Sequence, residues 1–210
     1  MLDSTIITDP YIFCLENVLS KYQCKRIIDK FEKNSNQHHQ GRTTGGVKLD
    51  VKNSKDLQIS YESNWKREDK LFFKAVNTAI RKYFDHLNSK HCLQNFTTGD
   101  DFTFPSFSSS RVTDTGYQLQ KTEPGKGYIW HSDYEHDNHK ARVLTYIIYL
   151  NDVEEGWTQF YNGNQISPRA GRLAIFPATW TYVHQGHPPL QTKYIMTGWI
   201  HTNLEPNGTT

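Results

Sequence analysis

The stretch VLTYIIYL, residues 143–150, is dominated by β-branched and aromatic residues and contains neither glycine nor proline. Such a run is typical of a buried β-strand. Further runs rich in apolar residues lie before and after it, separated by turn residues, at 117–121, 128–131, 157–161, 172–176 and 193–200. Six or more short strands with regular turns are characteristic of a sandwich or barrel, so the sequence predicts a mainly β core over about residues 102–203.

The part of the chain before this core predicts helices. We expect a helical start over Phe13–Phe31, where Ser20–Gln23 has the form of a capping box. A second helix is predicted over Glu68–Leu87, because apolar pairs recur there every four residues with charged residues between them. Residues 34–57, between the helices, are polar and glycine-bearing, so we expect a long loop with space for a short hairpin.

Length and composition favour one folded domain. The chain has 210 residues, of which 36% are hydrophobic and 22% charged. A chain of this length buries about 70% of the surface that its unfolded form exposes, which is enough for one core. We therefore expect a single domain over residues 1–210, in which about the first 100 residues form a helical support and a loop for the β core.

Composition also limits the classes of binding partner and the cellular compartment that we expect for the protein. Mean hydropathy is −0.74, and no apolar run approaches the roughly 20 residues that a membrane helix needs. The formal net charge of +2 argues against a nucleic-acid partner, which calls for a basic face. The first residues lack the features of a secretory signal, and the three cysteines are scattered: Cys14, Cys24 and Cys92. We expect a cytoplasmic protein with reduced thiols and neither a membrane nor a nucleic-acid partner.

His131 and Asp133 are the first candidate metal ligands. They lie two residues apart on a predicted strand, whose alternation places both side chains on one face. The pair alone is weak evidence, because 10 histidines and 22 acidic residues in 210 positions produce about one such triplet by chance. His184, which follows the strand beginning at Arg172, is the candidate third ligand. Two histidines and one carboxylate on one face of a metal are the set that non-haem Fe(II) oxygenases use.

Lys193 is a candidate anion-binding residue. It begins a predicted strand with three further residues on the same face, Ile195, Thr197 and Trp199. A lysine at the end of such a mostly apolar face is costly unless it meets an anion. The stretch 143–150 offers a matching face with two hydroxyl groups, on Thr145 and Tyr149. One ammonium, one phenol and small hydroxyls around an apolar slot suit a small dicarboxylate.

Several blocks of the sequence carry a family resemblance. GKGYIWHSD, residues 125–133, resembles the Gly-x-x-Tyr-x-x-His-x-Asp signature of prolyl 4-hydroxylase-like 2-oxoglutarate/Fe(II) dioxygenases. HQGHPPLQTKYIMTGW, residues 184–199, is similar to the distal block of that family, in which a lysine follows a histidine by nine residues and Thr and Trp come next. The intervening strands are similar as well, so the resemblance covers about residues 105–203.

The resemblance implies a fold and a set of site residues. The fold would be a double-stranded β-helix (jelly-roll) core with the N-terminal helices packed on it. His131, Asp133 and His184 would be the catalytic iron ligands. Lys193 would pair with the distal carboxylate of 2-oxoglutarate, and Tyr149 would hydrogen-bond it. Thr197, Tyr128 and Trp199 would be the other residues at the co-substrate site, and Trp199 would form a wall of the iron site.

The resemblance also implies a reaction. We expect a 2-oxoglutarate- and O₂-dependent hydroxylase that carries out prolyl 4-hydroxylation of a proline-containing peptide or protein and releases succinate and CO₂. Fe(II) is the expected metal, 2-oxoglutarate the co-substrate and L-ascorbate the reductant that rescues oxidised iron. Free proline or another amino acid is the alternative substrate. A non-catalytic cupin-like binding module would bind 2-oxoglutarate without turnover, and a metallohydrolase with Glu135 as base would work without O₂.

Two positions leave alternatives open. A tyrosine commonly stands six positions before the equivalent of Tyr128 in this family, whereas this chain has Thr122. Gln118 or Gln120 could supply the missing co-substrate contact. His187 is a rival third ligand, but the residue nine positions after it is a methionine, which offers no charge.

Three further features have two interpretations each. Residues 135–139 form either a second metal cluster or a solvated loop beside the site. The loop 34–57 either closes over a bound peptide as a lid or stays open. Four aromatic side chains either line a substrate groove or, as we expect for each one, pack against the barrel; these are Trp130, Trp157, Trp180 and Tyr182.

Overall fold

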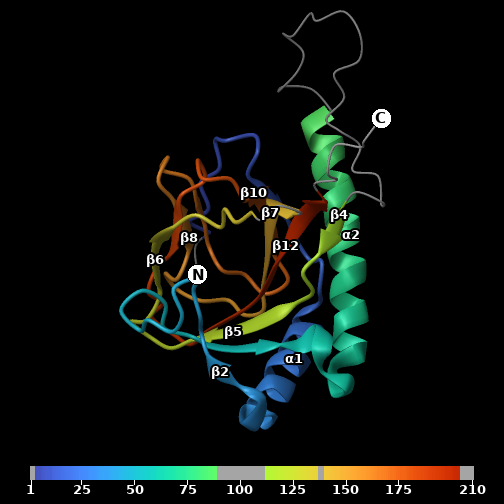
Figure 1. The fold of residues 1–210 in the computed structure, drawn as a ribbon, viewed down its shortest axis with the longest axis vertical. Coiled ribbons are helices and arrows are strands. Elements are labelled where there is room, and N and C mark those ends of the chain that lie inside the picture. Colours follow the sequence, from blue (N-terminus) through green and yellow to red (C-terminus); the bar gives the residue numbers. More distant parts are fainter. Residues whose placement is uncertain (1–2, 89–111, 137–139, 204–210) are drawn as a thin grey trace, which may run out of the picture.

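The core consists of two antiparallel β-sheets that face each other (Figure 1). The computed structural model describes residues 3–88, 112–136 and 140–203. The major sheet runs in the order β1 (Phe13–Leu15), β10 (Leu173–Pro177), β7 (Lys140–Tyr149), β12 (Lys193–Asn203), β5 (Gln118–Thr122), β3 (Lys55–Gln58), β2 (His39–Gln40), and β4 (Val112–Asp114) also pairs with β12. The minor sheet runs β6 (Tyr128–His131), β11 (His184–Gly186), β8 (Thr158–Phe160), β9 (Gln165–Ile166). The predicted jelly-roll core is confirmed.

Two helices cover the outer face of the major sheet. α1 (Lys21–Lys33) and α2 (Lys66–Asn88) lie on the side of that sheet away from β6 and β8 (Figure 1). Three short 3₁₀ turns complete the helical elements, η1 (Ser35–Gln37), η2 (Ile59–Tyr61) and η3 (Ser63–Trp65). Buried side chains of both helices form one hydrophobic core with the major sheet. The helices therefore support the sheet from behind, as predicted.

A second, smaller hydrophobic core lies between the two sheets. Its largest members are Tyr149, Phe160 and Phe176, all at most 2% exposed. Phe160 and Phe176 pack edge-on with ring centroids 4.9 Å apart, and Phe176 packs in the same way against His184. Apolar packing thus holds one end of the space between the sheets closed and fixes the position of a histidine beside it.

The start of α1 follows the predicted capping box. The Ser20 hydroxyl accepts a hydrogen bond from the Gln23 N–H at 3.2 Å, and the Gln23 side chain accepts one from the Ser20 N–H at 2.8 Å. These two bonds satisfy N–H groups that a helix start otherwise leaves unpaired. The side chains of Cys24, Ile27 and Phe31 are buried on the face of α1 that meets the core.

The structure has four short strands in segments for which the sequence did not predict a defined strand. Phe13–Leu15, expected within a helical start, forms β1 and pairs with β10. The loop 34–57 contains β2 and most of β3, which pair antiparallel in agreement with the short hairpin allowed for there, and which extend the major sheet beyond β5. His184–Gly186, expected to follow a turn, forms β11 between β6 and β8. Strands this short depend on their partners in the sheet and leave little signal in local sequence.

Some expectations lie outside the described residues. These include Cys92, the start of the predicted core before residue 112 and residues 137–139 of the polar stretch after Asp133. Within the residues that are described, none of the helices is long and apolar enough to cross a membrane.

Candidate metal and dicarboxylate site

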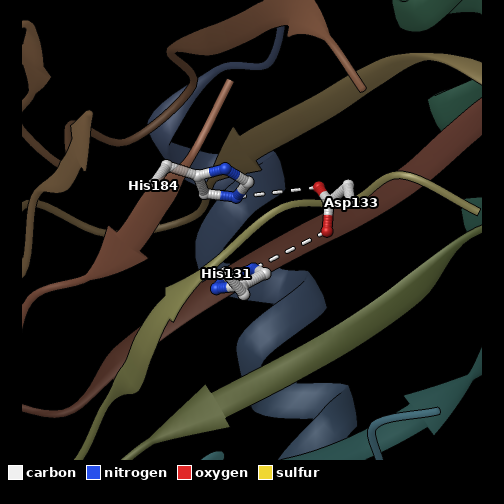
Figure 2. A group of neighbouring side chains, drawn as sticks. All are labelled: His131, Asp133 and His184. Atoms are coloured by element: carbon white, nitrogen blue, oxygen red, sulfur yellow. Dashed lines mark ion pairs between the residues drawn. The ribbon is translucent and has the colours of Figure 1, made fainter. Parts of the chain in front are cut away.

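His131, Asp133 and His184 converge at one point between the sheets (Figure 2). One potential ligand atom from each lies within 4.8 Å of the other two. β6 and β11 pair with His131 directly opposite His184, which makes the two imidazoles cross-strand neighbours. β6 ends at His131, so Asp133 lies just beyond the strand rather than on it as predicted, yet its carboxylate still points toward both histidines.

Backbone carbonyls orient both imidazoles. His131 Nδ1 lies 2.7 Å from the Ile129 carbonyl oxygen, and His184 Nδ1 lies 3.0 Å from the Tyr182 carbonyl oxygen. Each Nδ1 therefore carries the proton and donates it, which leaves the lone pair on Nε2. The two Nε2 atoms face the two oxygens of Asp133, at 3.6 Å for His131 and 3.7 Å for His184.

The Asp133 carboxylate is held from the major sheet. Thr145 on β7 donates its hydroxyl to Asp133 Oδ2 at 2.8 Å. Burial alone would raise the pKa of the Asp133 carboxyl, but His184, His131 and the Thr145 hydrogen bond outweigh it and hold the pKa below its ordinary value. The carboxylate is ionised at neutral pH and is ready to act as an oxygen ligand.

Burial keeps the His131 imidazole neutral. Burial first, and the neighbouring His184 next, lower the pKa of His131 to about 4. The Tyr128 ring stacks on the His131 ring with centroids 3.5 Å apart and covers one face of it. A neutral imidazole with a free Nε2 is the form that binds a metal.

Lys193 lies in the same cavity with its charge unpaired by any carboxylate. Its side chain is 5% exposed, and its ammonium donates to the Gly156 carbonyl oxygen at 2.7 Å. In the described part of the chain no carboxylate forms an ion pair with it. Burial lowers the pKa of Lys193 to about 8. A buried ammonium with spare N–H donors is a ready partner for an anionic ligand.

The other predicted co-substrate residues line this cavity too. Its volume is about 380 Å³, and its walls include Tyr128, Tyr149, Thr197 and Trp199. The Tyr149 hydroxyl shares a 2.7 Å hydrogen bond with the Thr158 hydroxyl. Thr197 donates to the Tyr146 carbonyl oxygen at 3.0 Å. Trp199 lies under the guanidinium of Arg142, which is 4.0 Å from the centre of its ring.

Part of the cavity wall comes from the segment 34–57, which the sequence analysis connected with the site only as one of two alternatives, a lid over a bound peptide. Five residues of 34–57 line the cavity, namely Arg42, Thr43, Thr44, Lys52 and Ser54. Backbone hydrogen bonds from Ile129 to Val51 and from Asn53 to Gly127 attach this segment to β6. Lys52 forms a buried ion pair with Asp56 at 2.8 Å. The segment is thus a wall of the cavity, and its closure over a peptide stays a prediction.

Several other candidates lie apart from the three ligand atoms. His187, the rival third ligand, stacks on Trp157 with centroids 4.4 Å apart and does not join the cluster. Glu135 forms an ion pair with Arg142. The expectation that each aromatic side chain packs against the barrel is wrong for Trp180, which is 69% exposed, and for Trp130, which is 42% exposed.

Two polar contacts were not predicted: Thr145, expected to face the dicarboxylate, instead donates to Asp133, and Thr158 pairs with Tyr149. Both are buried, and each meets a residue that the sequence did single out, Asp133 and Tyr149. The alternation along 143–150 places the Thr145 hydroxyl on the inward face, but the chain segment that it meets cannot be read from local sequence.

The donor set fits a divalent iron and a dicarboxylic acid. Two imidazole nitrogens and one carboxylate oxygen on one side of a metal leave positions open for other ligands, as in non-haem Fe(II) oxygenases. The unpaired, buried ammonium of Lys193 in the same cavity suits the second carboxylate of a ligand that reaches the metal with its first.

Comparisons with known proteins point the same way. Residues 117–201 match the model of the 2OG-Fe(II) oxygenase superfamily. Comparison with curated proteins by sequence gives no significant match.

Solved structures of prolyl hydroxylases share the fold. A viral collagen prolyl hydroxylase from Paramecium bursaria Chlorella virus-1, in a 2-oxoglutarate complex, has a TM-score of 0.61 at 21% identity, with 91% of this chain and 96% of that chain covered. A prolyl hydroxylase from Trichoplax adhaerens, in complex with a peptide fragment of hypoxia inducible factor, has a TM-score of 0.65 at 18% identity, with 91% and 83% covered. A Pseudomonas putida prolyl-4-hydroxylase has a TM-score of 0.60 at 14% identity, with 90% and 91% covered.

The superfamily match spans both histidines, the aspartate and Lys193, and the structural matches show that the prolyl hydroxylase fold extends over nearly the whole chain. Fe(II) and 2-oxoglutarate are accordingly the metal and the co-substrate. Residues 117–201 match the model of the 2OG-Fe(II) oxygenase superfamily, the chain has the fold of the prolyl hydroxylases, and both findings support an Fe(II)/2-oxoglutarate-dependent dioxygenase.

Proposed function

We propose that this dioxygenase hydroxylates a prolyl residue of a peptide or protein at C4 and that residues 1–210 act as one catalytic domain. The observation that carries the proposal is the arrangement of His131, Asp133 and His184 at one place in a cavity that also holds the buried, unpaired ammonium of Lys193. The fold shared with three prolyl hydroxylases supports the choice of prolyl residues.

In this proposal His131 Nε2, His184 Nε2 and an Asp133 oxygen would hold Fe(II). The bound iron, with 2-oxoglutarate and O₂, supplies an oxidative decarboxylation that yields succinate and CO₂ and places the second oxygen atom in a C–H bond of the substrate. Thr145 keeps the carboxylate in place, and the two backbone carbonyls keep both imidazoles in the ligating tautomer.

Lys193 would bind the distal carboxylate of 2-oxoglutarate. Gly156 holds the ammonium in position from behind, and the Tyr149 hydroxyl, already paired with Thr158, lies in the same cavity. Thr197 and Trp199 continue the wall from Lys193 toward the metal ligands along β12. Tyr128 covers His131 and excludes water from one face of the ring.

Two features favour a peptide over a free amino acid, namely one exposed aromatic side chain at the cavity and an exposed aromatic pair outside it. Tyr134 lines the cavity and is 45% exposed. Trp130, adjacent to His131, packs edge-on against Tyr161 with centroids 6.0 Å apart, and Tyr161 is 82% exposed. A free amino acid would use the cavity alone, whereas an extended peptide continues over the neighbouring surface, where aromatic side chains are the preferred contacts.

Mass spectrometry of proline-containing peptides tests the proposal. The protein is incubated with Fe(II), 2-oxoglutarate, ascorbate and air, and peptide mass and succinate are followed together. We expect one added oxygen on proline for each succinate formed. The Asp133→Ala variant should lose at least 99% of turnover while its far-UV circular dichroism stays unchanged, since a ligand is lost but no core contact. Succinate release with free proline but with none of the peptides would contradict a peptide substrate.

Removal of one exposed ring tests how the peptide binds. Trp130→Ala should raise the KM for a peptide about tenfold and leave kcat unchanged, because the ring lies outside the cavity and contributes binding only. Tyr22→Ala, which removes a more exposed ring (69% against 42% for Trp130) from α1 behind the major sheet, is the control and should change neither constant. An unchanged peptide KM in Trp130→Ala would place the peptide elsewhere.

A further inference from the structure

Two linked glutamine side chains line the cavity beside the proposed co-substrate site. Gln118 and Gln120 lie two residues apart on β5 and both face the cavity. Gln120 Nε2 donates to Gln118 Oε1 at 2.6 Å, so the amides act as a pair. A primary amide carries two N–H donors, and within the described residues no acceptor is found for those of Gln118.

The strand register places the pair along the path between Lys193 and the metal ligands. β5 pairs with β12 so that Thr122, Gln120 and Gln118 lie opposite Lys193, Ile195 and Thr197, in that order. On its other edge β12 pairs Trp199 with Thr145, the residue that holds Asp133. A dicarboxylate that reaches from Lys193 to the metal therefore passes Gln120 first and Gln118 next.

Three hydroxyl groups along this path already take part in hydrogen bonds, and the Tyr149–Thr158 pair keeps one O–H free. The Thr197 hydroxyl donates to a backbone carbonyl, and the Tyr149 and Thr158 hydroxyls share one hydrogen bond. The wall formed by β7 is completed by the apolar side chain of Ile147. Since a carboxylate accepts hydrogen bonds and cannot donate them, it needs free donors. On the β5 side of this path, between the ammonium and the metal ligands, the Gln118 amide supplies such donors, as the unpartnered indole N–H of Trp199 does from β12.

We infer that Gln118 donates a hydrogen bond to the keto-acid end of 2-oxoglutarate, the end that reaches the metal, and that Gln120 positions Gln118 for this contact. The inference rests on the proposed placement of the metal and of the distal carboxylate. According to this inference, the two side-chain amides on β5 recognise the keto-acid end of 2-oxoglutarate, and Lys193 recognises the other end. Thr122 lies opposite Lys193, and its side chain is too short to extend far into the cavity. The longer side chains of Gln118 and Gln120 extend there instead.

Calorimetric binding of 2-oxoglutarate tests the inference without turnover. The full chain is loaded with Mn(II) and titrated without O₂. Gln118→Met, which keeps the length of the side chain and removes the amide, should raise the Kd about tenfold and leave Mn(II) affinity unchanged. Gln120→Met should raise the Kd about threefold. The double variant should bind no more weakly than Gln118→Met alone, because Gln120 acts through Gln118.

A matched glutamine provides the control. Gln58 on β3 pairs with Gln118, is half-buried like it and donates to the Thr115 carbonyl oxygen, but it does not line the cavity. Gln58→Met should bind 2-oxoglutarate as the unmodified protein does. If Gln118→Met does not fold, Gln118→Asn, which keeps the amide on a shorter side chain, should show the same tenfold loss.

Ligand analogues and Lys193→Met separate this inference from the proposed function. With 2-oxopentanoate, which lacks the distal carboxylate, Gln118→Met should keep its tenfold effect and Lys193→Met should have none. Equal binding of 2-oxoglutarate by Gln118→Met and the unmodified protein, with Lys193→Met much weaker, would overturn the role of Gln118 alone. A Gln118→Met effect that disappears with 2-oxopentanoate would place its contact at the distal end and also overturn it. No 2-oxoglutarate binding by the Mn(II)-loaded, unmodified protein would overturn the proposed function itself.

Discussion

The ammonium group of Lys193 is buried, and burial costs free energy when the group is charged. Burial brings the pKa of its ammonium to about 8, from an ordinary value of 10.5. That difference corresponds to a penalty on the order of 3 kcal/mol on the charged form. The native pKa lies below the unfolded one, so the penalty is complete below pH 8 and stability rises as the pH goes from about 8 to 10.5. A bound carboxylate removes the penalty and raises the pKa again.

The affinity for 2-oxoglutarate should therefore depend on pH in a defined way. Between pH 7 and 8 the free ammonium is mostly charged, and the Kd should change little. Above pH 8 binding must take up a proton, so the Kd should rise about tenfold per pH unit until the pKa of the complex is reached. Calorimetry of the Mn(II)-loaded protein in buffers of different ionisation enthalpy measures both the Kd and the protons taken up.

Arginine at the same position serves as the control for this titration. Lys193→Arg keeps a positive charge that does not titrate below pH 12, so its Kd should be flat from pH 7 to 9. A flat profile in the unmodified protein would mean that Lys193 is not the group that meets the carboxylate.

At the scale of elements, the turn before β8 positions Lys193. Glu155 and Gly156 both have positive φ values, 57° and 63°. A Cβ on Gly156 would lie 2.8 Å from Pro189 Cβ and 3.5 Å from Lys193 Cδ. Only glycine combines this backbone conformation with such a close approach, and its carbonyl oxygen is the one that holds the ammonium.

Gly156→Ala should thus impair both stability and binding. Left-handed strain and the contact with Pro189 should together cost about 2–4 kcal/mol, and the displaced lysine should weaken 2-oxoglutarate binding. Gly163, in the β8–β9 turn, has a φ of 86° and open space where an alanine methyl group would lie. Gly163→Ala should cost about 1–2 kcal/mol and leave binding intact. Urea midpoints and the Kd check both variants, and equal losses in the two would refute the special role of Gly156.

Sequence predicts those elements that carry their own local signal. Ser20 and Gln23 cap α1 as expected, and the long apolar strand β7 extends from the stretch 143–150. β1 was missed because Phe13–Leu15 becomes a strand only through pairing with β10. The convergence of His131 and His184 follows from strand pairing between distant segments, which spacing along the chain does not encode. For the same reason, the loop 34–57 could be connected with the site only as an alternative, and its cavity-lining residues between Arg42 and Ser54 could not be named.

On the scale of the whole molecule, the N-terminal segment ties the minor sheet to the end of β10. Ile6 pairs with Gln165 of β9, and Thr5 bonds the Ser167 hydroxyl at 2.8 Å. The guanidinium of Arg172, which is 4% exposed, donates to the carboxylates of Asp3 and Glu16 at 2.5 and 2.6 Å. The Arg172 guanidinium beside Asp3 holds the pKa of that carboxyl well below its usual range. A buried guanidinium without these carboxylates would be costly.

Asp3→Asn should lower the thermal midpoint by about 2–4 °C at pH 7. The native pKa of Asp3 is depressed, so its contribution is present above the unfolded pKa near 4 and is lost as the pH falls below that value. The difference between the two proteins should shrink steadily from pH 5 to pH 2 in thermal melts. Asp29→Asn, which breaks the exposed pair with Lys25 on α1, should leave the midpoint unchanged. A gap that stays constant with pH would exclude the Asp3 titration as its source.

The cavity lies on the seam between the two sheets. His131 and His184 belong to the minor sheet, while Lys193 and Thr145 belong to the major one. A metal and a dicarboxylate bound in this cavity would connect the minor sheet to the major sheet. Apart from them, the two sheets pack against each other through a small apolar core. Amide hydrogen exchange should register this directly. Binding of the metal and the dicarboxylate should slow amide exchange most in β6 and β11, and least in α1 and α2 behind the major sheet. The ligands of the reaction would then also determine how often the two sheets separate locally.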